Sequence, residues 1–94
     1  LLAGLDPRVE GYQARVEHLE LVKQLLQRSA DRYREKYELS TSRIDDFKLA
    51  IGYLNALKRL HTVIGETQNA EIIKRKIDVW RSKMETDERK AQAK

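Results

Sequence analysis

Helix-period apolar patterning runs through most of this chain and breaks clearly at only two places. The breaks fall at residues 38–42 and 65–69, and the single proline, Pro7, precedes both of them. Elsewhere apolar residues recur at spacings of three and four, the repeat of one face of an α-helix. The two breaks therefore predict three helices, over about residues 7–38, 43–64 and 69–87.

Short connections restrict how three such helices can be arranged. Each break is about five residues long, so each helix must turn back beside the one before it. Amphipathic helices cover their apolar faces by packing against one another. We therefore predict an all-α fold, an antiparallel up-down-up three-helix bundle that forms one domain over residues 1–94. The charged segment 88–94 is expected to fray at the end of the third helix.

Residues at the predicted helix ends support these boundaries. Ser42, followed three residues later by Asp45, resembles an imperfect capping box for the second helix. Gly65 suits a left-handed position at the end of that helix. Thr67 or Asn69 can cap the third helix. Because residue 1 is leucine, we expect the chain to be a fragment of a larger protein, which could supply a further helix.

Composition limits the chemistry that the chain can carry. It has no cysteine, which excludes disulfides, thiol nucleophiles and cysteine-ligated metals. This composition suits a reducing compartment, and we expect an intracellular, cytoplasmic location. No segment approaches the roughly 20 apolar residues of a membrane span. Charged residues make up 36% of the chain, and the net charge of +4 favours encounters with acidic partners.

Catalytic motifs are absent from the sequence. Neither His18 nor His61 follows a glutamate at the Glu-x-x-His spacing of carboxylate-bridged metal sites. The chain also lacks a His-Glu-x-x-His motif and a glycine-rich phosphate loop. His61 falls within the apolar arc of the second helix, and we expect it to be a partly buried core residue. We therefore predict a non-enzymatic protein with no catalytic residue, no metal site and no cofactor.

The first two helices carry more apolar surface than two neighbours can cover. Apolar residues spread over about 240° of the second helix, and the part around Leu49, Tyr53, Ala56 and Leu60 is the most plausible exposed region. The first helix carries a second patch besides its main stripe, formed by Ala14, His18, Leu21 and Leu25. Ile72 and Val79 form a weaker third surface. The surplus indicates a wide internal interface, a missing helix of the parent chain, or a docking surface.

The third helix offers an alternative, basic surface. Five cations fall between residues 74 and 83, namely Lys74, Arg75, Lys76, Arg81 and Lys83. Nucleic-acid binding would need them on one face. Helix geometry instead places Lys74 and Arg81 on one flank of the apolar stripe, and Lys76 and Lys83 on the other. Such positions are typical of long side chains at the rim of a buried stripe. Trp80 lies at the centre of that stripe, so we expect it to be a core residue.

These patterns favour a module for protein–protein interaction or assembly. We expect it to dock a helical segment of a protein partner, or to form a homo-oligomer, through the surplus apolar surface of the first two helices. The alternative is a basic helical module that binds nucleic acid or an acidic partner through the third helix.

Overall fold

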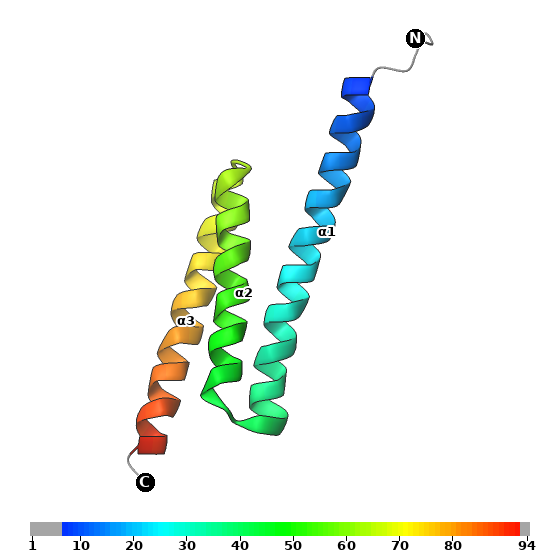
Figure 1. Ribbon diagram of the computed structural model, residues 1–94. Coiled ribbons are helices and arrows are strands. Elements are labelled where there is room, and N and C mark those ends of the chain that lie inside the picture. Colours follow the sequence, from blue (N-terminus) through cyan, green and yellow to red (C-terminus); the bar gives the residue numbers. More distant parts are fainter. Residues whose placement is uncertain (1–6, 93–94) are drawn as a thin grey trace.

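The computed structural model describes residues 7–92, and the side chains of residues 15–92. It confirms the predicted all-α three-helix bundle (Figure 1). Helix α1 spans Pro7–Lys36, α2 spans Ile44–Val63 and α3 spans Thr67–Gln92, and a short π-helical turn, η1, occupies Tyr37–Thr41. The third helix is longer than predicted. It begins at Thr67 rather than 69, and residues 88–92, which we expected to fray, form its last turn.

The turn between α1 and α2 differs from the predicted capping box. Ser42 adopts a left-handed conformation with φ of 52°, and its N–H donates to the carbonyl of Tyr37 at 3.0 Å. It therefore closes η1 instead of capping α2, and no side chain caps the N-terminal end of α2. The hydroxyl of Thr41 donates to Asp46 at 2.6 Å and ties the turn to the first turn of α2.

The turn between α2 and α3 follows the prediction for Gly65, which has a left-handed φ of 82°. The N–H of Glu66 donates to the carbonyl of His61 at 2.8 Å, and that of Gly65 donates to Thr62 at 3.2 Å. These two bonds form a Schellman motif. The carbonyl of Glu66 then accepts the N–H of Ala70 at 3.0 Å, so α3 starts directly after Glu66. Neither Thr67 nor Asn69 is the cap that we predicted, because both lie inside the helix.

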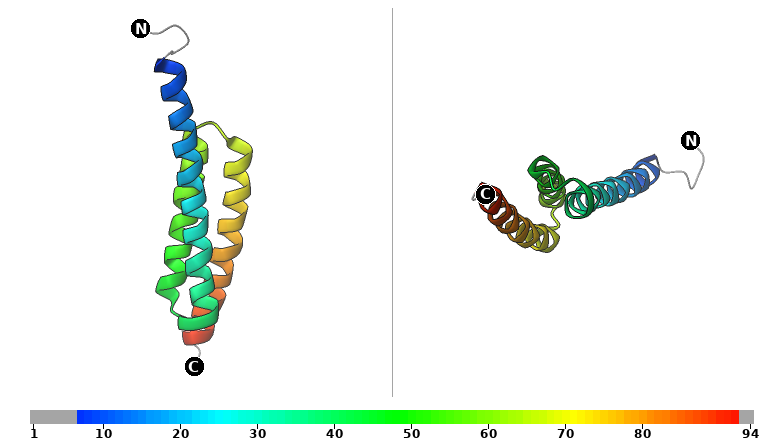
Figure 2. Two further views of the ribbon diagram at one scale, coloured as in Figure 1. Left: turned by 90° about the vertical axis from the view of Figure 1, so that its right-hand side faces the viewer. Right: turned by 90° about the horizontal axis from the view of Figure 1, so that it is seen from below.

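Helix α2 lies between the other two helices. Seen along the helix axes, α1 and α3 lie on different sides of α2 (Figure 2). Within residues 7–92, no Cα atom of α1 comes within 8 Å of one in α3. Packed helix axes usually lie about 8–10 Å apart, so α1 and α3 pack on α2 rather than closely on each other. The molecule is correspondingly long and flat, at 71 × 25 × 13 Å.

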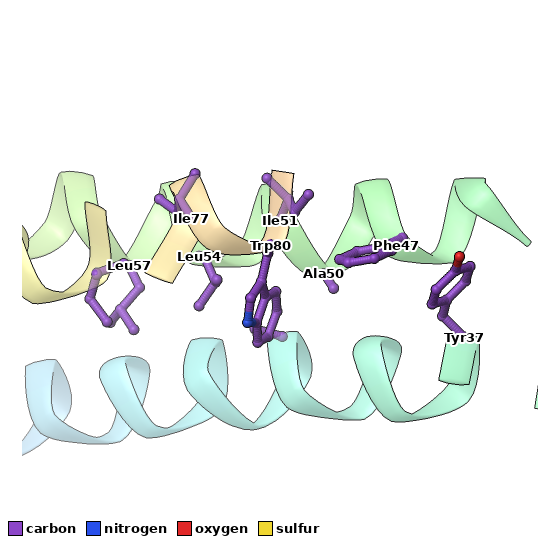
Figure 3. Close-up of a cluster of buried hydrophobic side chains, with 10 residues drawn as sticks. Tyr37, Phe47, Ala50, Ile51, Leu54, Leu57, Ile77 and Trp80 are labelled. Carbon is purple, nitrogen blue, oxygen red and sulfur yellow. The ribbon is translucent and has the colours of Figure 1, made fainter. Parts of the chain in front are cut away.

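The core is centred on α2 near the α1–α2 turn. Phe47 and Leu54 are fully buried, and Phe47 lies between Tyr37 and Trp80, with ring centroids 4.7 and 6.4 Å away (Figure 3). The buried cluster comprises Ala30, Tyr37, Phe47, Ala50, Ile51, Leu54, Leu57, Ile73, Ile77 and Trp80. The predictions that Trp80 and His61 are core residues are confirmed, since each residue is only 8% exposed.

Polar side chains link α1 and η1 to α3 and to the α2–α3 turn. Tyr37 donates to Asp87 at 2.6 Å, Lys76 lies 3.6 Å from Asp31, and Lys23 pairs with Glu66 at 2.7 Å. An apolar helix placed over this seam would have to bury these charges, which is costly. The seam is therefore not the place where the surplus apolar surface gathers.

Candidate docking surface on α1 and α2

Helix α2 presents its uncovered apolar residues beside α1. Leu49 is 48% exposed, Tyr53 and Leu60 are half-buried, and Ala56 is exposed. They lie on this side because α3 packs against another part of the α2 circumference. The structure thus places the α2 residues singled out from the sequence along one side of the helix.

A shallow groove of about 680 Å³ runs along this side of α2. It is lined by Leu26, Asp45, Lys48, Leu49, Gly52, Tyr53 and Ala56. The ring of Tyr53 stacks on Tyr33 of α1, with centroids 5.6 Å apart, so the two tyrosines join the helices beside the groove. Most of the lining is apolar, and the charged lining residues are Asp45 and Lys48.

Gly52 keeps part of the groove open. A Cβ atom built at this position would meet no atom within 4 Å. Gly52 and Ala56 lie one turn apart, with Leu49 and Tyr53 beside them. Internal packing does not require a glycine here, although glycine weakens a helix by about 1 kcal/mol relative to alanine. The small side chains would allow another backbone to approach α2 closely.

The apolar patch predicted on α1 is exposed, and its residues are not among those that line the groove. Leu21 and Leu25 are 53% and 52% exposed, and His18 is exposed as well. Leu25 is the chain neighbour of the groove residue Leu26 and lies about 100° from it around the helix. The side chain of Ala14 lies outside the described residues. We call Leu21, Leu25, Leu26, Leu49, Gly52, Tyr53 and Ala56 together the α1–α2 surface.

Four groove residues were not singled out as binding residues from the sequence, namely Leu26, Asp45, Lys48 and Gly52. Leu26 falls on the main apolar stripe of α1, where periodicity predicts only that the side chain is buried. Gly52 falls among the polar residues of α2, and a glycine gives no periodic signal of its own.

Val63 is 82% exposed at the end of α2, although it belongs to the apolar arc of that helix.

Ile72 and Val79 form a separate patch. They are 58% and 67% exposed on α3, and Ile72 lines a small depression with Thr67, Gln68, Glu71 and Arg75. The groove on α1 and α2 has no α3 residue among its described lining. The third predicted surface is therefore not continuous with the other two.

The basic residues of α3 do not form one free surface. Lys76 lies 5.1 Å from the Trp80 ring centroid, as well as close to Asp31, and Lys83 pairs with Asp87 at 3.1 Å. Lys74, Arg75 and Arg81 are exposed. Because Trp80 is buried, it cannot stack on a base, which weakens the nucleic-acid alternative.

His61 takes part in an internal polar cluster. Its Nδ1 lies 2.8 Å from Glu66, whose carboxylate also pairs with Lys23. The bonds from Lys23 and His61 hold the pKa of Glu66 below its ordinary value. Among the side chains of residues 15–92, no group of three or more histidines and acids is placed to hold a metal ion. In the same part of the chain, no helix has the length and apolar character needed to cross a membrane.

Comparison with known proteins identifies a family for this chain. The sequence profile of the TP0443 family matches residues 1–88. No curated protein and no solved structure matches the chain.

Proposed function

The chain belongs to the TP0443 family, and we propose that it is a non-enzymatic interaction module whose protein partner docks on the α1–α2 surface. One observation carries the proposal: a single apolar groove is lined by leucines of two helices, Leu26 of α1 and the exposed Leu49 of α2. Grooves of this kind accept amphipathic helices whose anchors recur at every third or fourth residue.

Simple energetics indicate what the partner must fill. Burying the exposed halves of Leu21, Leu25 and Leu49 would contribute about 1 kcal/mol for each side chain. Association itself costs roughly 4 kcal/mol or more. The partner must therefore also occupy the groove over Gly52 and Ala56 to bind measurably. A helical segment of another protein and a second copy of this chain would both bury this surface, and the solution mass separates the two.

Paired substitutions test the proposal. Leu25→Asp with Leu49→Asp places two charges on the α1–α2 surface, and Ile72→Asp with Val79→Asp is the matched control on α3. The readouts are light-scattering mass over a concentration series and the binding of a synthetic amphipathic leucine-anchored peptide. We expect the first pair to abolish binding or self-association and the control pair to retain it. Circular dichroism should show native helix content in both.

Two results would contradict this function. If the first pair binds the peptide as the parent does, the partner does not use the α1–α2 surface. If the α3 pair alone loses binding, the interaction belongs to the Ile72/Val79 patch.

A further inference from the structure

The α1–α2 surface has cations around it. Lys48 lines the groove on α2. Arg59 lies seven residues, or about two helical turns, after Gly52 and therefore on the same side of α2. On α1, Arg32 lies seven residues after Leu25, and Arg28 lies one turn from it. Lys36 sits 5.8 Å from the ring centroid of Tyr33, which stacks on the groove residue Tyr53. We call Arg28, Arg32, Lys36, Lys48 and Arg59 the basic rim.

The cations of the basic rim differ from those at the α1–α3 seam. All five are exposed or nearly so, and none makes an ion pair with another described residue. At the seam, by contrast, Lys23 and Lys76 pair with acids of the same chain. Asp45 is the one acid among the groove-lining residues. The rim therefore carries more positive than negative charge beside the apolar groove.

We infer that the partner of the α1–α2 surface is an acidic amphipathic helix, whose apolar anchors enter the groove and whose Asp and Glu residues face the basic rim. This inference rests on the proposed function and adds the chemistry of the partner. Complementary rim charges accelerate encounter and exclude wrongly charged partners.

A second copy of the chain fits this surface less well. Two copies joined face to face would bring two basic rims into one interface, where like charges repel. The exposed apolar patch on α3 of a second copy would fit the α1–α2 surface no better, because the cations Arg75 and Lys83 border Ile72 and Val79. The net charge of +4 adds to the repulsion in either arrangement.

Two synthetic peptides of about 18 residues test the inference. Both carry leucine anchors at the same helical spacing, and their flanking residues are glutamate in one and lysine in the other. Fluorescence anisotropy gives the affinity at low and high salt. We expect the glutamate peptide to bind at least about tenfold more tightly at low salt, and the difference to shrink at high salt.

Charge reversal on the protein gives the complementary result. Arg28→Glu with Arg32→Glu and Lys48→Glu should reduce glutamate-peptide binding at least about tenfold and favour the lysine peptide. The matched control reverses three exposed cations of α3, Lys74, Arg75 and Arg81, which changes the net charge equally. We expect this control to bind the glutamate peptide within about threefold of the parent.

Four other outcomes would overturn the inference. Equal binding of both peptides would leave docking intact and exclude an acidic partner. Binding of neither peptide by a monomeric chain would contradict the proposed function itself. A dimer that Leu25→Asp with Leu49→Asp dissociates would identify a second copy as the occupant. Binding to vesicles containing phosphatidylserine, without binding to the glutamate peptide, would identify an anionic lipid surface.

Discussion

Arg34 joins all three helices through one side chain. From α1, its guanidinium carbon lies 5.0 Å from the ring centroid of Phe47 on α2 and 4.9 Å from that of Trp80 on α3. Its Nε donates to Glu38 at 3.0 Å. A planar guanidinium can stack on two rings and keep an ion pair, whereas an ammonium group cannot do all three. Arg34 therefore fills the place where α1 and α3 do not pack directly.

Replacing this arginine tests that role. We expect Arg34→Lys to lower the free energy of unfolding by about 1 kcal/mol, because the stacking on both rings is lost. Arg32→Lys is the matched control, since Arg32 is exposed, and it should change stability by less than about 0.5 kcal/mol. Urea denaturation followed by circular dichroism measures both. Equal effects of the two variants would show that Arg34 acts only through its charge.

Tyr37 makes the stability sensitive to alkaline pH. Burial, the hydrogen bond to Asp87 and the charge of that carboxylate raise the pKa of the Tyr37 hydroxyl from 10.0 to about 12. Above pH 10 the unfolded chain releases this proton while the folded chain keeps it. The contribution of Tyr37 to the free energy of unfolding is therefore complete below pH 10. It falls as pH rises towards 12, by at most about 1.4 kcal/mol per pH unit.

Tyr37→Phe isolates the effect, because it removes the hydroxyl and keeps the ring beside Phe47. We expect the variant to be about 1 kcal/mol less stable at neutral pH and to approach the parent between pH 10 and 12. Denaturation curves over this range measure the difference, and the ultraviolet absorbance of tyrosinate reports the titration directly. A constant difference between the two proteins across the range would contradict the raised pKa.

At the scale of the elements, two glycines have opposite roles. Gly65 has a positive φ that L-residues rarely adopt, whereas Gly52 lies within α2 and has free space at its Cβ position. We expect Gly65→Ala to destabilise the fold by about 1 kcal/mol. Gly52→Ala should stabilise it by about 0.5–1 kcal/mol, because alanine is the better helix former. Thermal and urea unfolding give both values.

Gly52→Ala also connects stability with docking. The added methyl group projects into the groove, so the stabilised variant should bind a helical peptide less tightly than the parent does. Unchanged or tighter binding would show that the partner does not approach α2 at Gly52.

The number and order of the helices could be predicted from the sequence because apolar periodicity reports which residues are inside. Trp80 and His61 follow that signal, and Gly65 follows from turn chemistry. The capping of α2 could not be predicted, because the N–H of Ser42 hydrogen-bonds to η1. A π-helical turn has no signature in the local sequence pattern. The groove depends on how widely α1 and α3 are spaced around α2. Periodicity could therefore indicate surplus apolar surface around Leu49 but not the opening over Gly52.

At the scale of the whole molecule, α1 is longer than its packing partner. Its 30 residues extend about 45 Å, whereas the 20 residues of α2 extend about 30 Å. The core contacts of α1 come from Leu26, Ala30 and Tyr33, in its C-terminal half. Further towards the N-terminus, Val16 is 40% exposed. Figure 1 shows the N-terminal end of α1 projecting beyond the α2–α3 turn. Short helices without tertiary packing are marginal in water.

This difference predicts a gradient of stability along α1. We expect backbone amides of residues 15–21 to exchange with solvent at least about tenfold faster than those of residues 26–33. The hydrogen bonds of residues 26–33 break only when the core unfolds, whereas those of residues 15–21 can break in local opening of the helix end. Hydrogen exchange followed by NMR measures each amide, at two protein concentrations. Docking of a helix on the α1–α2 surface should slow exchange around Leu21 and Leu25 and leave residues 73–80 of α3 almost unchanged. Uniform protection along α1 in the dilute, monomeric chain would contradict the gradient, whereas protection that grows with concentration would mean that a second copy covers the projecting turns.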